Sequence, residues 1–225
     1  MPENFDKTHP MGSGDRVVEQ GECVSSIAAD AHLPWKRIWN DPANSDLKAE
    51  RKDPNILLPR DRLTIPDVAT ADFSKPTDAS HTFTTVIDPV KLRLRLIAGD
   101  VAFSDQPFTL TIAGADAITG TTDSNGLIDV KIPPDAMTGT LQVGTTPHDD
   151  FIVLQFGSLN PVEVLTGVQQ RLMNLGIDCG PAGDDGIYGH RTQHALLAFQ
   201  NKMTLEPTGK PDDDTRDALK REHGC

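Results

Sequence analysis

The residue types best suited to metal or acid–base chemistry gather in the last third of the chain. His190 and His194 are four residues apart in a stretch with helical periodicity, so both rings can lie on one face, and Cys179 precedes them. No further Cys or His at ligand spacing completes a metal site. We therefore expect structural or surface roles for both histidines and no bound metal.

Acidic residues in the same region occur in runs, at Asp184-Asp185 and at Asp212 to Asp214. Paired carboxylates can cleave glycosidic bonds, but these runs lie in predicted loops and helix starts, where acids commonly serve turns and caps. The sequence contains no G-x-S-x-G, H-E-x-x-H or phosphate-loop motif. We predict no catalytic residue, no cofactor and no enzymatic activity.

The three cysteines are Cys23, Cys179 and Cys225. An odd number cannot pair completely within one chain, so reduced thiols are the simplest expectation. A bridge between Cys179 and Cys225 remains open.

Charge and hydropathy exclude two classes of partner. The net charge is −12 and no basic cluster is present, which disfavours nucleic acid, and no apolar run is long enough to insert into a membrane. The first residues lack the basic and apolar regions of a secretory signal. We expect synthesis in the cytoplasm without a classical signal peptide, with the cell envelope or a non-classical export route as open destinations.

Residues 159–225 have the pattern of a small three-helix bundle. Leu165, Val168 and Leu172 recur at helical spacing before Gly176, and Ala195, Leu196 and Phe199 form a second apolar stripe. The stretch DTRDALKRE forms the third predicted helix, which Asp212 or Asp213 can cap.

The blocks VQQRLMNLGI, DGIYGHRT and ALLAFQNKMTLEPTGKPDDDTRDAL give this segment its resemblance to the three-helix peptidoglycan-binding domains. The resemblance implies a non-catalytic module that docks on cell-wall glycan or peptide. Tyr188 is the only tyrosine available for stacking on a sugar. The expected contacts are Asp185, Gly186, Tyr188, Gly189 and Thr192.

A different pattern covers residues 13–67, after a flexible tail at 1–12. Strands are predicted at Arg16–Glu19 and Arg62–Ile65, with helices at Val24–Ala31 and from Pro34 to about Asn40. The stretch PANSDLKAERKDP reads as a polar insert in a loop. The predicted order is therefore βααβ.

This order, with VVEQGECVSSIA at one end and LLPRDRLTIP at the other, resembles a LysM domain. The resemblance implies a shallow groove for an N-acetylglucosamine unit, formed by backbone groups of two loops. Arg60 stands where the family usually has Gly. The expected contacts are Gly21, Glu22, Cys23 and Val24 on one loop and Asn55, Ile56, Leu57 and Leu58 on the other.

Between these segments, residues 68–80 read as a linker and residues 81–158 alternate apolar and polar positions, as antiparallel strands do. Asn125-Gly126 stands between two β-rich runs and predicts a hairpin. The segment resembles transthyretin-like or regulatory β-sandwich modules, which implies a spacer or docking platform.

The sequence thus predicts an α+β multidomain chain with a LysM-like domain, an antiparallel β-sandwich and a three-helix bundle. The predicted partner is peptidoglycan or a related glycan containing N-acetylglucosamine, bound by two modules held apart by a rigid spacer. The alternative is an adaptor, cargo or accessory of a contractile injection apparatus, such as a type VI secretion spike or phage-like tail, acting through protein contacts.

Overall fold

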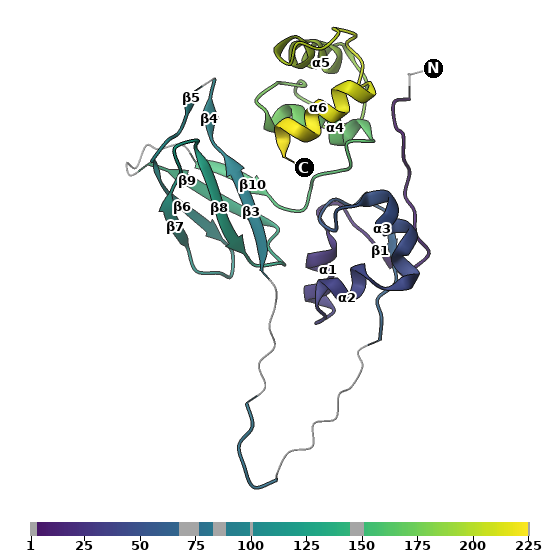
Figure 1. The fold of residues 1–225 in the computed structure, drawn as a ribbon, viewed down its shortest axis with the longest axis vertical. Coiled ribbons are helices and arrows are strands. Elements are labelled where there is room, and N and C mark those ends of the chain that lie inside the picture. The colour runs from purple at the N-terminus through teal and green to yellow at the C-terminus, as the bar shows by residue number, and fades with distance from the viewer. Residues whose placement is uncertain (1–3, 68–76, 83–88, 100, 145–150, 225) are drawn as a thin grey trace.

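The computed structural model describes residues 4–67, 77–82, 89–99, 101–144 and 151–224. Helices and antiparallel sheets together place the chain in the α+β class. Among the described residues, buried apolar side chains form three separate cores, within residues 11–65, 90–156 and 162–219. Figure 1 shows these parts of the ribbon as separate groups of helices and strands. We call the corresponding parts the N-terminal module, the β module and the C-terminal module. The predicted linker at 68–80 lies largely outside the described residues.

The N-terminal module carries its helices in the connection between two short antiparallel strands. Its elements are β1 (Arg16–Val17), α1 (Val24–Asp30), α2 (Trp35–Trp39), the 3-10 helix η1 (Pro42–Asn44), α3 (Ser45–Arg51) and β2 (Arg62–Leu63). The predicted strands and first two helices are found, in shortened form. The insert is helical rather than a loop, because Leu47 and Arg51 lie one turn apart and both are buried against the module.

A buried ion pair fixes the end of α3 to the turn before β2. Arg51 Nε and Nη2 donate to the two carboxylate oxygens of Asp61 at 2.7 and 2.8 Å, and both side chains are at most 1% exposed. Asp61 also accepts from the backbone N–H groups of Met11 and Leu58, each at 2.9 Å. A single carboxylate therefore joins three segments of this module.

The β module contains antiparallel sheets that share one core. The larger sheet has the order β10-β9-β6-β7, β3 pairs with β8, and β4 pairs with β5. The strands are β3 (Val90–Arg95), β4 (Ile97–Ala98), β5 (Val101–Ala102), β6 (Pro107–Ile112), β7 (Ile118–Thr121), β8 (Leu127–Ile132), β9 (Thr138–Val143) and β10 (Phe151–Gln155).

The hairpin predicted at Asn125-Gly126 is wrong in its pairing. The turn does form, since the Asp123 carboxylate accepts from the N–H groups of Asn125 and Leu127 at 2.7 and 2.8 Å. However, β7 before the turn pairs with β6, and β8 after it pairs with β3. The turn is thus a corner between two sheets, because strand partners distant in the sequence outcompete the local pairing.

The C-terminal module consists of α4 (Leu165–Asn174), α5 (His190–Lys202) and α6 (Asp213–His223) packed on one core. These helices confirm the three predicted, and the cap of α6 is Asp212, whose carboxylate accepts from Thr215 N at 2.9 Å. Gly167 lets the start of α4 approach the preceding loop closely. A Cβ there would lie 2.0 Å from the carbonyl oxygen of Pro161.

The N-terminal residues 4–11, which we call the strap, run from the C-terminal module to the N-terminal module (Figure 1). Lys7 N donates to Glu163 O at 2.8 Å, while Arg51 donates to Thr8 Oγ1 and His9 O, both at 2.9 Å. The strap therefore differs from the loose tail expected at 1–12. Polar composition alone does not show that a segment has partners elsewhere.

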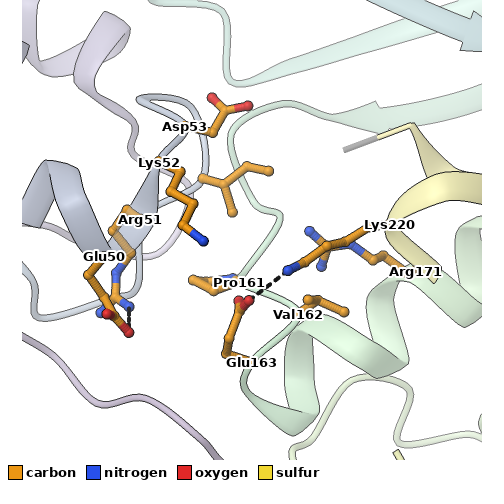
Figure 2. A pocket seen from close by; sticks show the side chains of 10 residues that line it. Glu50, Arg51, Lys52, Asp53, Pro161, Val162, Glu163, Arg171 and Lys220 are labelled. Carbon is orange, nitrogen blue, oxygen red and sulfur yellow. Dashed lines mark hydrogen bonds and ion pairs between the residues drawn. The ribbon is translucent and has the colours of Figure 1, made fainter. Parts of the chain in front are cut away.

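The two outer modules are not held apart by the β module, contrary to the predicted arrangement. The strap contacts both of them, and side chains of both line a common hollow (Figure 2). Within the described residues, no helix combines the length and apolar character that crossing a membrane requires.

Candidate functional site

The predicted contact loop of the C-terminal module, residues 185–189, is held from beneath by one buried amide. Gln169, on α4 and 1% exposed, accepts from Gly186 N at 2.8 Å. Its amide nitrogen donates to Asp185 Oδ1 and Thr192 Oγ1, both at 3.1 Å. The structure thus brings Asp185, Gly186 and Thr192 together, with Thr192 itself buried. Their positions suit bracing of the loop.

Tyr188 is half-buried, and its hydroxyl donates to Gly209 O at 2.7 Å. Its ring lies 4.5 Å from that of Phe5 in the strap, with the planes tilted by 52°. The hydrogen bond orients the ring, and Phe5 already packs against it. A sugar that stacks on Tyr188 must therefore share or replace the contact with Phe5.

Ile187 is the most exposed large apolar side chain of this loop, at 63%. The sequence does not single out Ile187, because an isolated Ile between Gly and Tyr has no periodic apolar neighbours. Exposed beside neighbours that Gln169 holds, it offers an apolar contact at a fixed place on the surface. Gly189, the remaining predicted contact in this loop, is the N-cap residue of α5.

The two loops predicted to form the groove of the N-terminal module do lie side by side. Val24 N donates to Pro54 O at 2.9 Å, and Ser25 Oγ donates to Asn55 Oδ1 at 3.1 Å. The side chains of Val24, Leu57 and Leu58 are buried in the module. Only their backbone groups can face a ligand. Of the remaining predicted contacts, Asn55 is exposed, Glu22 and Ile56 are half-buried, and Gly21 and Cys23 are buried.

The β module covers this groove. A hollow of about 70 Å³ is lined by Gly21, Cys23 and Asn55 from the N-terminal module and by Ile132, Ala136 and Phe156 from the β module. Gln20 Nε2 donates to Ser158 O at 2.9 Å. A Cβ on Gly157 would lie 2.5 Å from Gly21 O, which shows how closely the two backbones approach. Pockets that bind small molecules are several times larger.

A second hollow, of about 190 Å³, lies between the outer modules (Figure 2). Lys52 and Ile56 line it from the N-terminal module, and Pro161, Arg171 and Lys220 from the C-terminal module. Lys220 Nζ pairs with Glu163 at 2.8 Å. Burial acts to raise the pKa of Glu163, but the bond to Lys220 and a backbone hydrogen bond together hold it below its usual range. The lining carries one more cation than acid, with Arg51, Lys52, Arg171 and Lys220 against Glu50, Asp53 and Glu163.

Arg216 is a further functional candidate that the sequence does not single out, since it is one of several charged residues of both signs in α6. It is 3% exposed and lies on α6. Its Nε donates to Pro211 O at 2.9 Å, Nη2 to Phe5 O at 2.7 Å, and Nη1 to Val162 O. Burial lowers the pKa of Arg216, against the opposing effect of nearby carboxylates, but the guanidinium stays charged.

The candidate metal ligands do not converge. His190 and His194 are exposed, whereas Cys179 is buried in the core of the C-terminal module. Burial, aided by Asp178, Asp184 and Asp185, raises the pKa of the Cys179 thiol to about 11, which keeps it protonated. Cys225, the other half of the bridge considered for Cys179, lies outside the described residues. Within those residues, no cluster of three metal-binding side chains occurs.

Comparison with protein families gives a match in the C-terminal module. Residues 165–219 match the family described as "Putative peptidoglycan binding domain". The chain therefore carries a C-terminal peptidoglycan-binding domain, and the matched residues run from the start of α4 into α6. Comparisons with curated proteins and with solved structures returned no match.

Proposed function

We propose that this protein is a non-catalytic cell-wall protein that binds peptidoglycan through its C-terminal module. The observation that carries the proposal is the family match at residues 165–219, which coincides with three helices that share their own core. A unit with its own core can act as a recognition module beside other parts of a chain.

The surface we assign to the wall contact is the loop 185–189 with the start of α5. Gln169 fixes this loop, so little conformational entropy is lost on binding. Ile187 supplies exposed apolar area, and Tyr188 supplies an aromatic ring at the edge of the same surface. An acidic protein that binds an anionic wall needs such short-range, uncharged contacts.

We further propose that the N-terminal module is LysM-like and contacts N-acetylglucosamine through the backbone at residues 21–24 and 55–58. Support comes from the order of β1, α1, α2 and β2 and from the closeness of the two loops. Since the present hollow is about 70 Å³, this binding requires the β module to move away from Gly21. Engagement of both modules would increase avidity.

A second candidate function is that of an adaptor in a contractile injection apparatus, with the β module, proposed as a transthyretin-like sandwich, serving as the docking platform. The observation that favours it is the edge strand β10, whose Phe151 and Val153 are 61% and 71% exposed. Exposed apolar edge strands pair readily with strands of other proteins.

A pull-down on purified peptidoglycan sacculi tests the first function. We expect the wild-type protein to sediment with sacculi and Ile187→Asp to bind at least about tenfold more weakly, the effect of a desolvated charge in an apolar contact. Ile97→Asp is the matched control, because Ile97 is 47% exposed on the β module.

Wild-type protein that stays in the supernatant at both low and high salt would refute wall binding and favour the adaptor. Equal loss in both Asp variants would instead show that added charge, and not the loop, determines sedimentation. Soluble muropeptides released from the sacculi would contradict the non-catalytic assignment.

A further inference from the structure

The strap binds the C-terminal module as a peptide ligand would. Three consecutive residues contact it through different chemistry. The Phe5 ring lies against Tyr188 while Phe5 O accepts from Arg216. Asp6 Oδ1 accepts from Leu165 N, the first residue of α4, at 2.8 Å. Lys7 donates from its backbone to Glu163 O and pairs through its side chain with Asp213.

These contacts define a strap face, composed of Glu163, Leu165, Tyr188, Asp213 and Arg216. Tyr188 provides an aromatic surface, and Asp213 provides a carboxylate for an ammonium group. Arg216 can donate to a peptide carbonyl, and the N–H of Leu165 can donate to a carboxylate. A short, extended peptide with these groups in sequence satisfies all of them. The face therefore recognises a type of ligand, and residues 5–7 are one example of it.

Residues 5–7 of the strap are held more weakly than the residues that follow them. Asp6 and Lys7 are exposed, and the pair between Lys7 and Asp213 is 44% and 79% exposed, which makes it weak in water. The next residues are held differently. Thr8 and His9 bind the buried Arg51, at 2.9 Å each. Residues 5–7 can thus detach while the N-terminal module remains intact.

We propose that the strap face is a peptide-binding site occupied in cis by residues 5–7, and that strap release opens it to the carboxylate-bearing stem peptide of peptidoglycan. This proposal rests on the proposed function. A ligand carboxylate takes the place of Asp6 at Leu165 N–H, a ligand carbonyl takes the bond from Arg216, and a ligand ammonium faces Asp213. The bound strap lowers the apparent affinity by the fraction of molecules in which it is released.

The test compares two double variants of the full chain. Phe5→Ala with Asp6→Ala removes the ring and the carboxylate that hold the strap. His9→Ala with Asp15→Ala removes one ring and one carboxylate from exposed positions nearby, and the contact of His9 with Arg51 uses only its backbone. The probes are a labelled peptide of sequence NFDKT, matching residues 4–8, and purified stem peptides, both followed by fluorescence anisotropy.

We expect both probes to bind the Phe5/Asp6 variant about tenfold more tightly than the wild type or the control, the factor for a strap released about one-tenth of the time. Arg216→Met in the same background is expected to abolish this gain, with helical circular dichroism confirming the fold. Unchanged or weaker binding of NFDKT overturns the site. Binding of NFDKT without stem peptides overturns the ligand assignment.

Binding to sacculi distinguishes a failure of the strap proposal from a failure of the proposed wall binding. Sacculi that bind the wild type and the Phe5/Asp6 variant equally refute the strap proposal while leaving wall binding intact. Sacculi that bind neither protein, with NFDKT still bound by the variant, refute wall binding and the stem-peptide assignment together, but not the cis site.

Discussion

The two outer modules hold their loops with buried polar side chains that differ in charge, an ion pair in one and mainly neutral amides in the other. In the N-terminal module the centre is the ion pair of Arg51 and Asp61, whose carboxylate joins α3, the strap and the turn before β2. In the C-terminal module neutral amides hold the loops, beside the buried Arg216, which donates to backbone carbonyl oxygens. Gln169 holds the loop before α5, and Gln200 accepts from Gly209 N and donates to Thr208 and Thr215.

The difference shows where each module can tolerate change. Removing one partner of a buried ion pair is costly, because the other charge is then buried without either a counterion or water. An amide that loses a partner leaves neutral groups unsatisfied, at a smaller cost. The charged centre also holds Thr8 and His9 of the strap, so loss of the N-terminal fold should release this inner part of the strap.

The largest effect is expected for Asp61→Asn, which leaves the Arg51 charge buried without a counterion. We expect the free energy of unfolding of the N-terminal module to fall by about 3–5 kcal/mol. Urea unfolding followed by tryptophan fluorescence measures it selectively, because both tryptophans, Trp35 and Trp39, lie in this module. Glu50→Gln is the control, since Glu50 is exposed and 4.0 Å from Arg51. Equal effects of the two changes would remove the contrast between the modules.

A smaller effect is expected for Gln169→Leu, which leaves Gly186 N and Thr192 without their bonds to the amide. The expected cost is about 1–3 kcal/mol, confined to the C-terminal module. Hydrogen exchange read by segment should increase in the loop 185–189 and leave α1 and α2 unchanged. The exposed neighbour Met173, changed to Leu, provides the control on the same helix. Faster exchange in α1 would show that the modules unfold together.

Acid should affect the C-terminal module through His223. Burial, with Arg171 nearby, lowers the pKa of His223 to about 4, from an ordinary 6.5. Between these values the unfolded chain binds more protons, so stability falls as pH decreases through this window and is unaffected above it. Because the ring is partly exposed, the loss is about 1–2 kcal/mol.

Thermal unfolding of wild type and His223→Gln across that pH range measures this contribution. The variant should show a shallower decline below pH 6.5. Parallel pH profiles for the two proteins would show that His223 does not titrate in this window.

The smallest expected effect is a gain. Arg60 has φ of 77°, in the left-handed region that favours glycine. Arg60→Gly should relieve this strain and raise the stability of the N-terminal module by about 0.5–1 kcal/mol, as measured by tryptophan fluorescence. Arg62→Gly, at an extended strand position, is expected to destabilise. A loss of stability in Arg60→Gly would show that the side chain, not the backbone, determines the preference.

Local patterns predicted the parts of the structure that depend on local forces. The apolar stripe at Leu165, Val168 and Leu172 predicted α4, because the amphipathicity of a helix depends on residues close together in the sequence. Asn125-Gly126 gave the turn but not the partner of the strand after it, which is β3 and distant in sequence. The strap was missed for the same reason. Its contacts depend on Arg51 and Arg216, which nothing in residues 4–11 specifies.

The candidate site also has a part that the sequence predicted and a part that it did not. The loop at 185–189 followed from blocks of sequence characteristic of a domain family, and the family match includes it. The supports of that loop did not follow, because Gln169 becomes important only through burial next to the loop. The closeness of Gly157 to Gly21 likewise depends on how two modules meet, which no single segment encodes.

The contact between Phe5 and Arg216 spans 211 positions, and this has a consequence for biosynthesis. A ribosome makes residue 5 long before α6, so the N-terminal module can fold while residues 5–7 still lack their partners in the C-terminal module. Until α6 emerges, those residues remain available to chaperones or other chains. The contact of the strap with Arg216 is therefore among the last to form in a newly synthesised chain.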